Sequence, residues 1–307
     1  MTAAGAETAV ITEPADGATP RPRVRQRLPR PAQLGLVPFG AYVVLFLVVP
    51  TVLAVATGFF DKTGRFTLDN VGALADPVII TTFWNSTWLS LLTAAVGALV
   101  GALVCYALLG VPAHHPTRSA IDALAGVLAQ FGGVMLAFVF IAAMGRNSLI
   151  NVWLSGMGIN IYATSNWLYE LPGLILPYIY FQIPLMVITF GPALDALKPQ
   201  WAEANLTLGG NRWTFWTRIG LPVLAPSFAA SYLLLFANSF SAYATAAALA
   251  SQGSQIVPLQ IRAALTSETV LGRENLAGAL ALGMIAVMAV VMTGYALIQR
   301  RAERWRR

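Results

Sequence analysis

The chain has 307 residues, of which 57% are hydrophobic and only 10% are charged. Soluble domains carry about a quarter charged residues, so this composition excludes an ordinary soluble protein. The single cysteine, Cys105, has no partner within the chain, which excludes a disulfide-stapled secreted scaffold. The net charge of +6 does not indicate nucleic-acid binding in so apolar a chain, and the lipid bilayer is the expected partner.

Six charge-free stretches are long enough to cross a bilayer as helices, which takes about 20 apolar residues. Each stretch is continuously apolar, whereas the strands of a membrane barrel alternate with a period of two. The sequence therefore predicts an all-α membrane protein with six transmembrane helices, at Leu36–Phe59, Thr87–Leu109, Ala123–Gly145, Leu171–Leu194, Pro226–Leu249 and Leu276–Ile298.

The stretch Asn147–Tyr169 is also free of charge and is a rival seventh span. It is rich in Asn, Ser and Gly, which is a heavy polar load for the hydrocarbon region. A seventh span here would also place the three bases of the next loop outside. We therefore interpret this stretch as an outer loop with a segment that lies on the membrane surface.

The basic residues predict the orientation, because loops on the cytoplasmic side carry an excess of Lys and Arg. If the amino terminus is cytoplasmic, the outer segments hold few of the bases: Lys62, Arg65, Arg146, Arg262 and Arg273. Both termini are therefore expected in the cytoplasm. Residues 1–30 are predicted to be a disordered basic tail near anionic headgroups, and residues 31–307 the transmembrane domain. Ala54 and Ala56 mimic the cleavage site of a signal peptide, but the long polar leader and the full-length apolar run argue against cleavage.

Neither lysine belongs to a phosphate-binding loop, because Lys62 follows Asp61 and Lys198 precedes Pro199. The chain is therefore not expected to hydrolyse nucleotides itself.

Other catalytic or metal-binding groups are sparse. The pair His114 and His115 is interpreted as part of a short inner loop, and Asp122 and Asp195 stand only at the inner ends of their spans. Ionisable groups in the middle of spans, which mark ion or proton pathways, are missing. We expect no catalytic residue and no metal site. The alternatives of a secondary transporter and of a membrane-embedded enzyme are weakened but stay open.

The inner loop between the fourth and fifth spans, residues 196–222, is long for a simple connection. Pro199 suits the first turn of a short helix, and Gly209 or Gly210 can take the left-handed conformation that ends it. Asn211 can cap a second helix, which we expect Pro222 to stop before span five. Its aromatic residues are expected to anchor it at the membrane interface: Trp213, Phe215 and Trp216.

The same loop matches the pattern E-A-A, three residues, G, nine residues, I-x-L-P at six positions: Glu203, Ala204, Gly209, Ile219, Leu221 and Pro222. On these residues the chain resembles the inner-membrane permease subunits of binding-protein-dependent ABC importers of the type I fold. It departs from the pattern at Asn205, usually a second alanine, and at Gly210, where alanine often follows the glycine. Asn205 is expected to weaken the fit of the small-residue face against a partner.

The resemblance implies that the first short helix of this loop is a coupling helix that docks on a separate ATPase dimer. Glu203 offers a charge that an arginine of this partner can meet. The alternative is that Glu203 is only a solvated acid at the start of the helix. ATP and Mg²⁺ would be used by that dimer, and this chain would bind no cofactor. A second permease subunit, identical or paralogous, and an extracytoplasmic solute-binding protein are the further partners, in a bacterial plasma membrane. The segment Gly145–Asn151, with Pro177 and Pro184, is similar to the branch that carries polyamines, ferric iron, thiamine or phosphonates.

Polar residues in spans four and five are candidates for the translocation pathway. Tyr178 and Gln182 are neighbours on span four. The spacing of the span-five residues predicts one shared face, which either lines a cavity or hydrogen-bonds to other helices: Ser227, Ser231, Asn238, Ser241 and Thr245. Gly97 and Gly101 in span two have the small-xxx-small spacing that lets helices pack closely.

Overall fold

The computed structural model describes residues 36–61, 63–112, 115–163, 165–250, 256–266 and 274–304, so the predicted tail 1–30 lies outside the described residues. This part of the chain is mostly helical and contains no β-strand. Six of its helical segments are long and apolar enough to cross a membrane, which confirms the predicted number of spans: Val37–Thr57, Pro77–Leu108, Gly133–Gly156, Leu171–Asp195, Arg212–Leu249 and Asn275–Leu297.

The structure separates into two units, Met1–Pro50 and Thr51–Arg307. The first contains α2 (Leu36–Val43) and the π-helix η1 (Val44–Val48), whose apolar side chains are largely exposed. A helix that is apolar on all sides suits a lipid environment. The helix widens at η1 because the following Pro50 has no N–H to donate to the preceding turn. It continues as α3 (Val49–Thr57).

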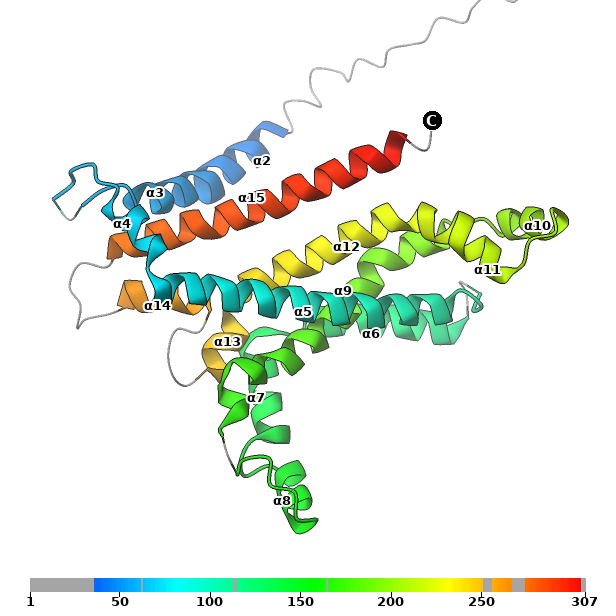
Figure 1. The fold of residues 1–307 in the computed structure, drawn as a ribbon, viewed down its shortest axis with the longest axis horizontal. Coiled ribbons are helices and arrows are strands. Elements are labelled where there is room, and N and C mark those ends of the chain that lie inside the picture. Colours follow the sequence, from blue (N-terminus) through cyan, green and yellow to red (C-terminus); the bar gives the residue numbers. More distant parts are fainter. Residues whose placement is uncertain are drawn as a thin grey trace, which may run out of the picture. The chain divides into compact units, whose positions relative to one another are not determined.

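Three long helices pack against one another at the centre of the second unit: α5 (Pro77–Leu108), α9 (Ile175–Asp195) and α12 (Leu221–Ser241). Around them, α6 (Pro116–Gln130) runs along α9, and α15 (Glu274–Arg304) packs against α12 (Figure 1). Asp76 begins α5 by accepting a hydrogen bond from the Val78 N–H at 2.8 Å. The hydrogen bond satisfies a backbone N–H of the first helical turn, which has no partner within the helix.

Gly97 and Gly101 lie where α5 approaches α9 most closely. A Cβ atom at Gly101 would lie 2.5 Å from Cβ of Met186 and 2.8 Å from the carbonyl oxygen of Ile183, and a Cβ at Gly97 would collide with Gln182. The two glycines therefore set the distance between these helices, as their spacing predicts.

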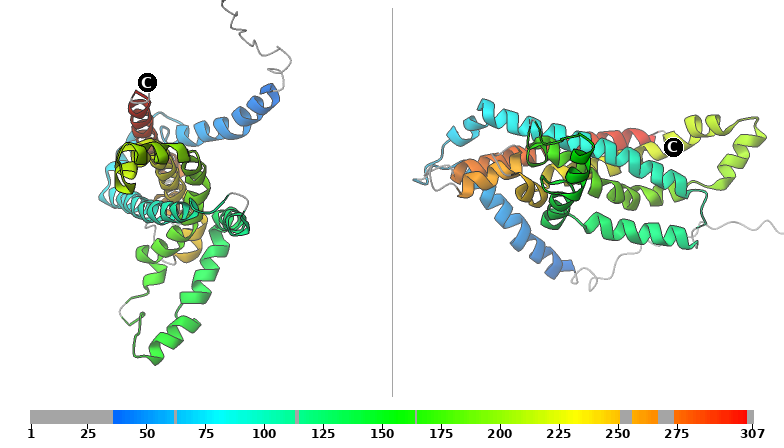
Figure 2. Two further views of the ribbon diagram at one scale, coloured as in Figure 1. Left: turned by 90° about the vertical axis from the view of Figure 1, so that its right-hand side faces the viewer. Right: turned by 90° about the horizontal axis from the view of Figure 1, so that it is seen from below.

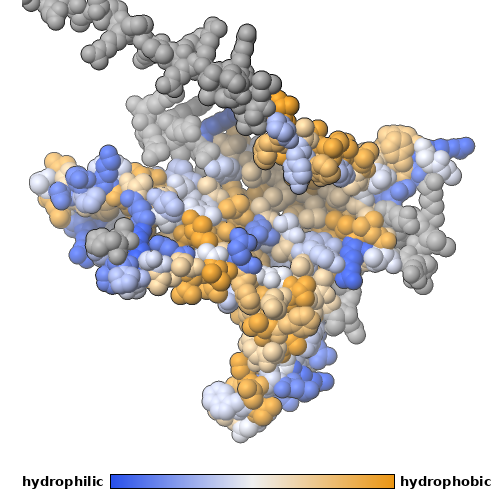
Figure 3. Space-filling model, turned by 180° about the vertical axis from the view of Figure 1, so that it is seen from behind, coloured by the Kyte–Doolittle hydropathy of each residue, from blue (hydrophilic) through white to orange (hydrophobic). Residues whose placement is uncertain are grey.

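Shorter elements gather at the two ends of this bundle. At the end that we call the α14 end lie α4 (Asp69–Gly72), η2 (Ala73–Ala75) and α14 (Val257–Thr266). At the opposite, α10 end lie α10 (Pro199–Thr207), α11 (Arg212–Phe215) and the π-helix η5 (Trp216–Gly220). Figure 3 shows apolar residues over much of the face and hydrophilic residues gathered around the α10 end.

The third span differs from the prediction. Ala123–Gly145 is not one helix, because α6 ends at Gln130. The following helix, α7 (Gly133–Met144), runs in a clearly different direction from α6 (Figure 2). Gly133 has a φ of 68°, a conformation that favours glycine and that interrupts a helix. Because the residues on both sides of the break are apolar, hydropathy along the sequence does not reveal it.

The predicted outer loop Asn147–Tyr169 contains a short amphipathic helix, α8 (Leu149–Gly156), capped by the Ser148 hydroxyl, and a 3₁₀ turn, η3 (Trp167–Tyr169). A second 3₁₀ turn, η4 (Leu171–Leu174), leads into α9.

Span five also differs from the prediction. Pro226–Leu249 is expected as one helix, but the structure divides it into two. Here α12 ends at Ser241, Ala242 takes an extended conformation, and the chain resumes as α13 (Ala244–Leu249), which packs against α7.

We expect Gly101→Ala to lower the thermal stability of the detergent-solubilised protein, because the added methyl must displace Met186 or the α9 backbone. Overpacking of this kind costs about 1–3 kcal/mol. The matched control is Gly126→Ala in α6, where a Cβ atom has no neighbour within 4 Å. Unfolding temperatures measured by tryptophan fluorescence test this. An equal stability of the two variants would contradict the close α5–α9 contact.

Candidate coupling loop and translocation residues

Backbone hydrogen bonds close the carboxyl end of α10 around Gly209. Gly209 has a φ of 79°. Its N–H donates to the Leu206 carbonyl at 3.0 Å, and the Gly210 N–H donates to the Asn205 carbonyl at 2.8 Å. These two bonds form a Schellman ending. Pro199 lies in the first turn, as predicted. The backbone itself thus defines both ends of α10.

Asn205 folds back toward the loop instead of facing outward. Its side chain is 8% exposed, and its Nδ2 donates to the Asn211 carbonyl at 3.0 Å. A Cβ atom at Gly210 would lie 2.7 Å from Cγ and 2.8 Å from Nδ2 of Asn205. The two departures from the E-A-A pattern are therefore one structural feature, in which the asparagine occupies the space that a side chain at position 210 would need.

The exposed side chains of α10 and of its carboxyl end include one acid and two large apolar residues. Glu203 and Ala204 are exposed, and Leu206 and Leu208 are 61% and 87% exposed. Exposed apolar groups of this size beside a charge are typical of a surface that contacts another protein.

Asn211 caps the second helix, as predicted, because its Oδ1 accepts from the Thr214 N–H at 2.8 Å. The expectation that Pro222 stops this helix is wrong. α11, η5 and α12 follow one another, and Pro222 lies in the first turn of α12. The missing N–H of Pro222 is absorbed by the wider turns of η5 just before it. Ile219 is half-buried and Leu221 is exposed.

Of the three predicted interface anchors, Trp216 packs against the bundle. Its ring meets that of Tyr106 in α5 edge-on, with centroids 5.3 Å apart. It also covers Gly220, where a Cβ atom would lie 2.7 Å from the indole. Phe215 meets Trp216 edge-on, whereas Trp213 is 77% exposed. The continuous α11–α12 segment is thus fastened to α5.

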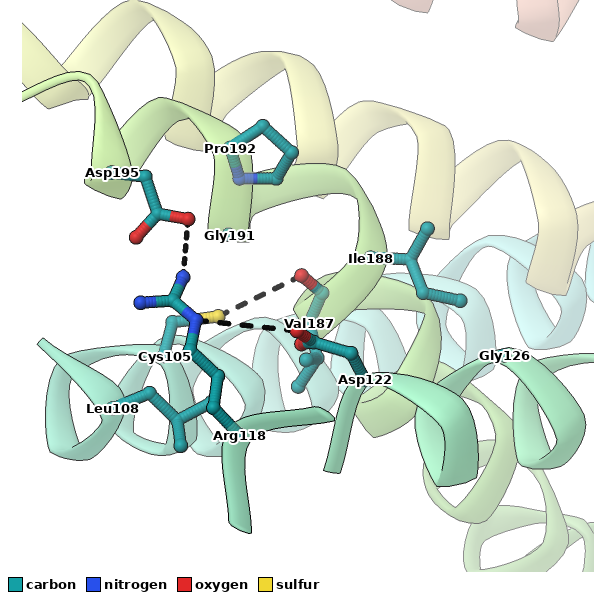
Figure 4. Close-up of a pocket in the computed structure, with 10 residues that line it drawn as sticks. All are labelled: Cys105, Leu108, Arg118, Asp122, Gly126, Val187, Ile188, Gly191, Pro192 and Asp195. Atoms are coloured by element: carbon teal, nitrogen blue, oxygen red, sulfur yellow. Dashed lines mark hydrogen bonds and ion pairs between the residues drawn. The ribbon is translucent and has the colours of Figure 1, made fainter. Parts of the chain in front are cut away.

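Arg118 of α6 lies between three elements at the α10 end (Figure 4). Its guanidinium donates to Asp195, the last residue of α9, and to the Val111 carbonyl at 3.5 Å, and its Nε is 4.0 Å from Asp122. The hydrogen bond to Asp195 raises the pKa of Arg118. Arg118, Asp122, Asp195 and Cys105 line a cavity of about 360 Å³. One arginine therefore forms ion pairs with both of the acids that the sequence places at span ends.

Tyr178 and Gln182 are fully buried, and each donates to a backbone carbonyl of α12 or of the residue that follows it. The Tyr178 hydroxyl donates to the Ala242 carbonyl at 2.8 Å, and Gln182 Nε2 donates to the Leu235 carbonyl at 2.8 Å. The Oε1 of Gln182 is buried without a partner among the described residues. Within one subunit these side chains join helices, and their place in the translocation pathway stays a prediction.

The break after Ser241 divides the polar face predicted on span five. Asn238 and Ser241 are exposed on α12, and the Ser241 hydroxyl donates to the Ala237 carbonyl at 2.9 Å. Thr245, in α13, is 2% exposed and donates to the Gly133 carbonyl at 3.1 Å. Asn238 and Ser241 are thus exposed in one subunit, and their place in the translocation pathway stays a prediction. Thr245 instead connects the breaks in spans three and five.

Two interhelical contacts have no signal in the sequence. Thr93 of α5 and Ser239 of α12 share a hydrogen bond of 3.0 Å, and the Ser86 hydroxyl accepts from the Val257 N–H at 2.8 Å, which fixes α14 to α5. Such hydroxyls are common in apolar spans, and nothing local shows which pairs will meet.

Among the residues that the structure describes, no three His, Cys, Asp or Glu side chains come together as a metal site would require. His115 instead caps α6, since its Nδ1 accepts from the Thr117 N–H at 3.3 Å.

Comparison with known families agrees with this arrangement. The family model described as "Binding-protein-dependent transport system inner membrane component" matches residues 133–307, which is more than half of the chain. The chain therefore belongs to this family, the permease subunits of ABC importers.

Individual relatives are distant. The chain is 22% identical over 275 residues to the spermidine/putrescine transport system permease protein PotB of Haemophilus influenzae, covering 86% of this chain and 93% of the relative. It is 28% identical over 130 residues to the sulfate transport system permease protein CysT of Escherichia coli, covering 42% of this chain and less than half, 45%, of the relative.

Among solved structures, a bacterial ABC transporter involved in the import of the acidic polysaccharide alginate has a chain with a similar fold. The TM-score is 0.71 at 18% sequence identity, and the superposition covers 88% of this chain and 95% of that chain. A second similar fold, in the MetNI methionine ABC transporter, gives a TM-score of 0.53 at 13% identity, covering 74% of this chain and 99% of that chain.

We expect Gly210→Ala alone to loosen the 196–222 loop, because its methyl displaces Asn205 from the Asn211 carbonyl. The double variant Asn205→Ala/Gly210→Ala, which removes the obstructing side chain, should recover most of the loss. Limited proteolysis of the purified protein, followed by mass spectrometry of the cleavage sites, measures loop opening. Wild-type resistance of Gly210→Ala, or a double variant as sensitive as the single one, would contradict the coupling of the two positions.

Proposed function

We propose that this chain is the membrane-spanning permease of an ATP-driven importer and that α10 is the helix through which a separate ATPase acts on it. The observation that carries the proposal is the exposed face of α10. Its end is closed at Gly209, Glu203 and Leu206 are exposed three positions apart along the helix, and Leu208 is exposed just after it. An arginine on the ATPase can pair with the carboxylate, while the leucines enter an apolar groove.

The same proposal places the α10 end in the cytoplasm and the chain in the bacterial plasma membrane. Basic residues support this orientation, because the α10 end carries Arg118, Lys198, Arg212 and Arg218. Both termini then lie on the cytoplasmic side.

The mechanism follows from the continuity of the helices around α10. ATPase subunits that close on ATP and Mg²⁺ would draw the α10 helices of two permeases together. On one side only three residues separate α10 from α9, and on the other side α11, η5 and α12 form one uninterrupted segment. Movement of α10 is therefore transmitted to two central helices. The chemistry of hydrolysis belongs to the partner, and this chain contributes alternating access to the two sides of the membrane.

A second permease subunit, identical or paralogous, completes the pore, and an extracytoplasmic binding protein delivers a small solute. One alginate transporter structure that is similar in fold contains such a periplasmic protein, with a TM-score of 0.70. Relatives are named for sulfate, spermidine and putrescine, ferric iron and molybdenum. Because these solutes differ in charge, we assign most of the selectivity to the binding protein. Asn238, Ser241 and Gln182 are our candidates for pathway contacts.

We expect Glu203→Arg and Gly209→Pro to abolish attachment of a co-expressed ATPase subunit, as judged by co-purification and by ATP hydrolysis in proteoliposomes. The first reverses the docking charge, and the second imposes a negative φ where the loop needs a positive one. Membrane insertion should be normal. Glu170→Arg, which reverses an exposed acid outside the loop, is the control. Normal attachment of both loop variants, at normal protein levels, would refute the docking role of α10.

We expect a cysteine introduced as Gln200→Cys to be protected from a membrane-impermeant maleimide in intact cells and labelled after permeabilisation. The background is Cys105→Ala, which removes the buried native thiol. Asn166→Cys, in the exposed segment before η3, should be labelled in intact cells. Labelling of position 200 from outside would place α10 on the wrong side of the membrane for an ATPase.

A further inference from the structure

The ion pair between Arg118 and Asp195 lies at the base of the 196–222 loop. Asp195 is the last residue of α9, and only Ala196, Leu197 and Lys198 separate it from the start of α10. Leu194 just before it is 3% exposed and Leu197 packs against the same apolar cluster. The first residues of the loop are therefore packed against the bundle, and Asp195 is joined directly to them.

The contact between α6 and the base of the loop depends on the positive charge of Arg118. Asp195 stands at the carboxyl end of a helix, where the helix dipole disfavours a negative charge. Asp122 lines the same cavity from α6. Without the guanidinium the two carboxylates would repel each other across the α6–α9 contact. The Arg118 side chain is 14% exposed and Asp195 is 46% exposed, so the guanidinium is packed into the bundle while solvent reaches the carboxylate.

The other end of α6 reaches the broken part of span five. α6 is 15 residues long, and at about 1.5 Å per residue it carries displacement over about 22 Å. Beyond its end, the Gly133 carbonyl accepts the hydrogen bond of Thr245 at the start of α13. The Tyr178 hydroxyl holds the Ala242 carbonyl just before α13. A connected set of contacts thus runs from the loop base to both helix breaks.

We propose that Arg118 is a positioning residue that transmits movement of α10 to α6, and through the Gly133–Thr245 contact to the break in span five. The proposal rests on the ATPase-coupling function proposed above. Docking itself uses the outer face of α10, which Arg118 does not touch. Loss of the ion pair should therefore leave the ATPase bound and hydrolysing at its basal rate. What is lost is the acceleration of hydrolysis when the binding protein engages the opposite side.

The test uses the complete complex in proteoliposomes, with the binding protein added as purified from its host with its own ligand. The single reversals Arg118→Asp and Asp195→Arg should each lower the stimulation of ATP hydrolysis by about fivefold, the size of effect typical of residues that carry coupling between sites. The exchange variant Arg118→Asp/Asp195→Arg, which restores an opposite-charge pair, should recover most of the stimulation.

Asp122→Asn is the matched control, because it removes an acid of the same cavity without breaking the contact between α6 and α9. It should behave like the wild type. The proposal is overturned if the single reversals keep full stimulation, if the exchange variant is no better than the worse single variant, or if the reversals release the ATPase subunits. Failure of the wild-type chain to bind an ATPase would instead refute the proposed function.

Discussion

Every interruption of a helix inside this apolar bundle leaves backbone groups that lipid cannot satisfy, and the structure is organised around meeting that demand. The carbonyls at the two breaks are taken by hydroxyls from other helices: Tyr178 holds Ala242, and Thr245 holds Gly133. Gln182 adds a bond to the Leu235 carbonyl in unbroken α12. These few side chains decide how spans three, four and five are placed relative to one another.

The bundle and the 196–222 loop use different means to hold their geometry. In the bundle, glycines bring α5 and α9 close enough for direct backbone contact, so packing and side-chain hydrogen bonds dominate. In the loop, backbone bonds around Gly209 and the caps at Pro199 and Asn211 suffice. Leu197 and Trp216 fasten the two ends of the loop to the bundle, so the loop can present a docking face and move together with the helices that flank it.

The sequence predicts the loop better than the bundle. The start of α10, its glycine ending and the Asn211 cap are each specified by residues a few positions apart, and all three agree with the structure. Pro222 was misjudged, because a proline in the first turn of a helix is indistinguishable locally from one that ends a helix. The break at Gly133 was missed because the residues on both sides are equally apolar, although the Gly132–Gly133 pair was a usable sign.

Hydropathy alone determined that the chain has six spans, and the E-A-A pattern identified the loop between the fourth and fifth of them, since both signals come from contiguous residues. Only the tertiary structure decided which polar residues pair. Gln182 and Leu235 are 53 positions apart, and Thr93 and Ser239 are 146 apart. Such pairings depend on how whole helices rotate and approach once packed. No local pattern encodes that rotation, and for this reason the pairing of Arg118 with Asp195 emerged from the fold.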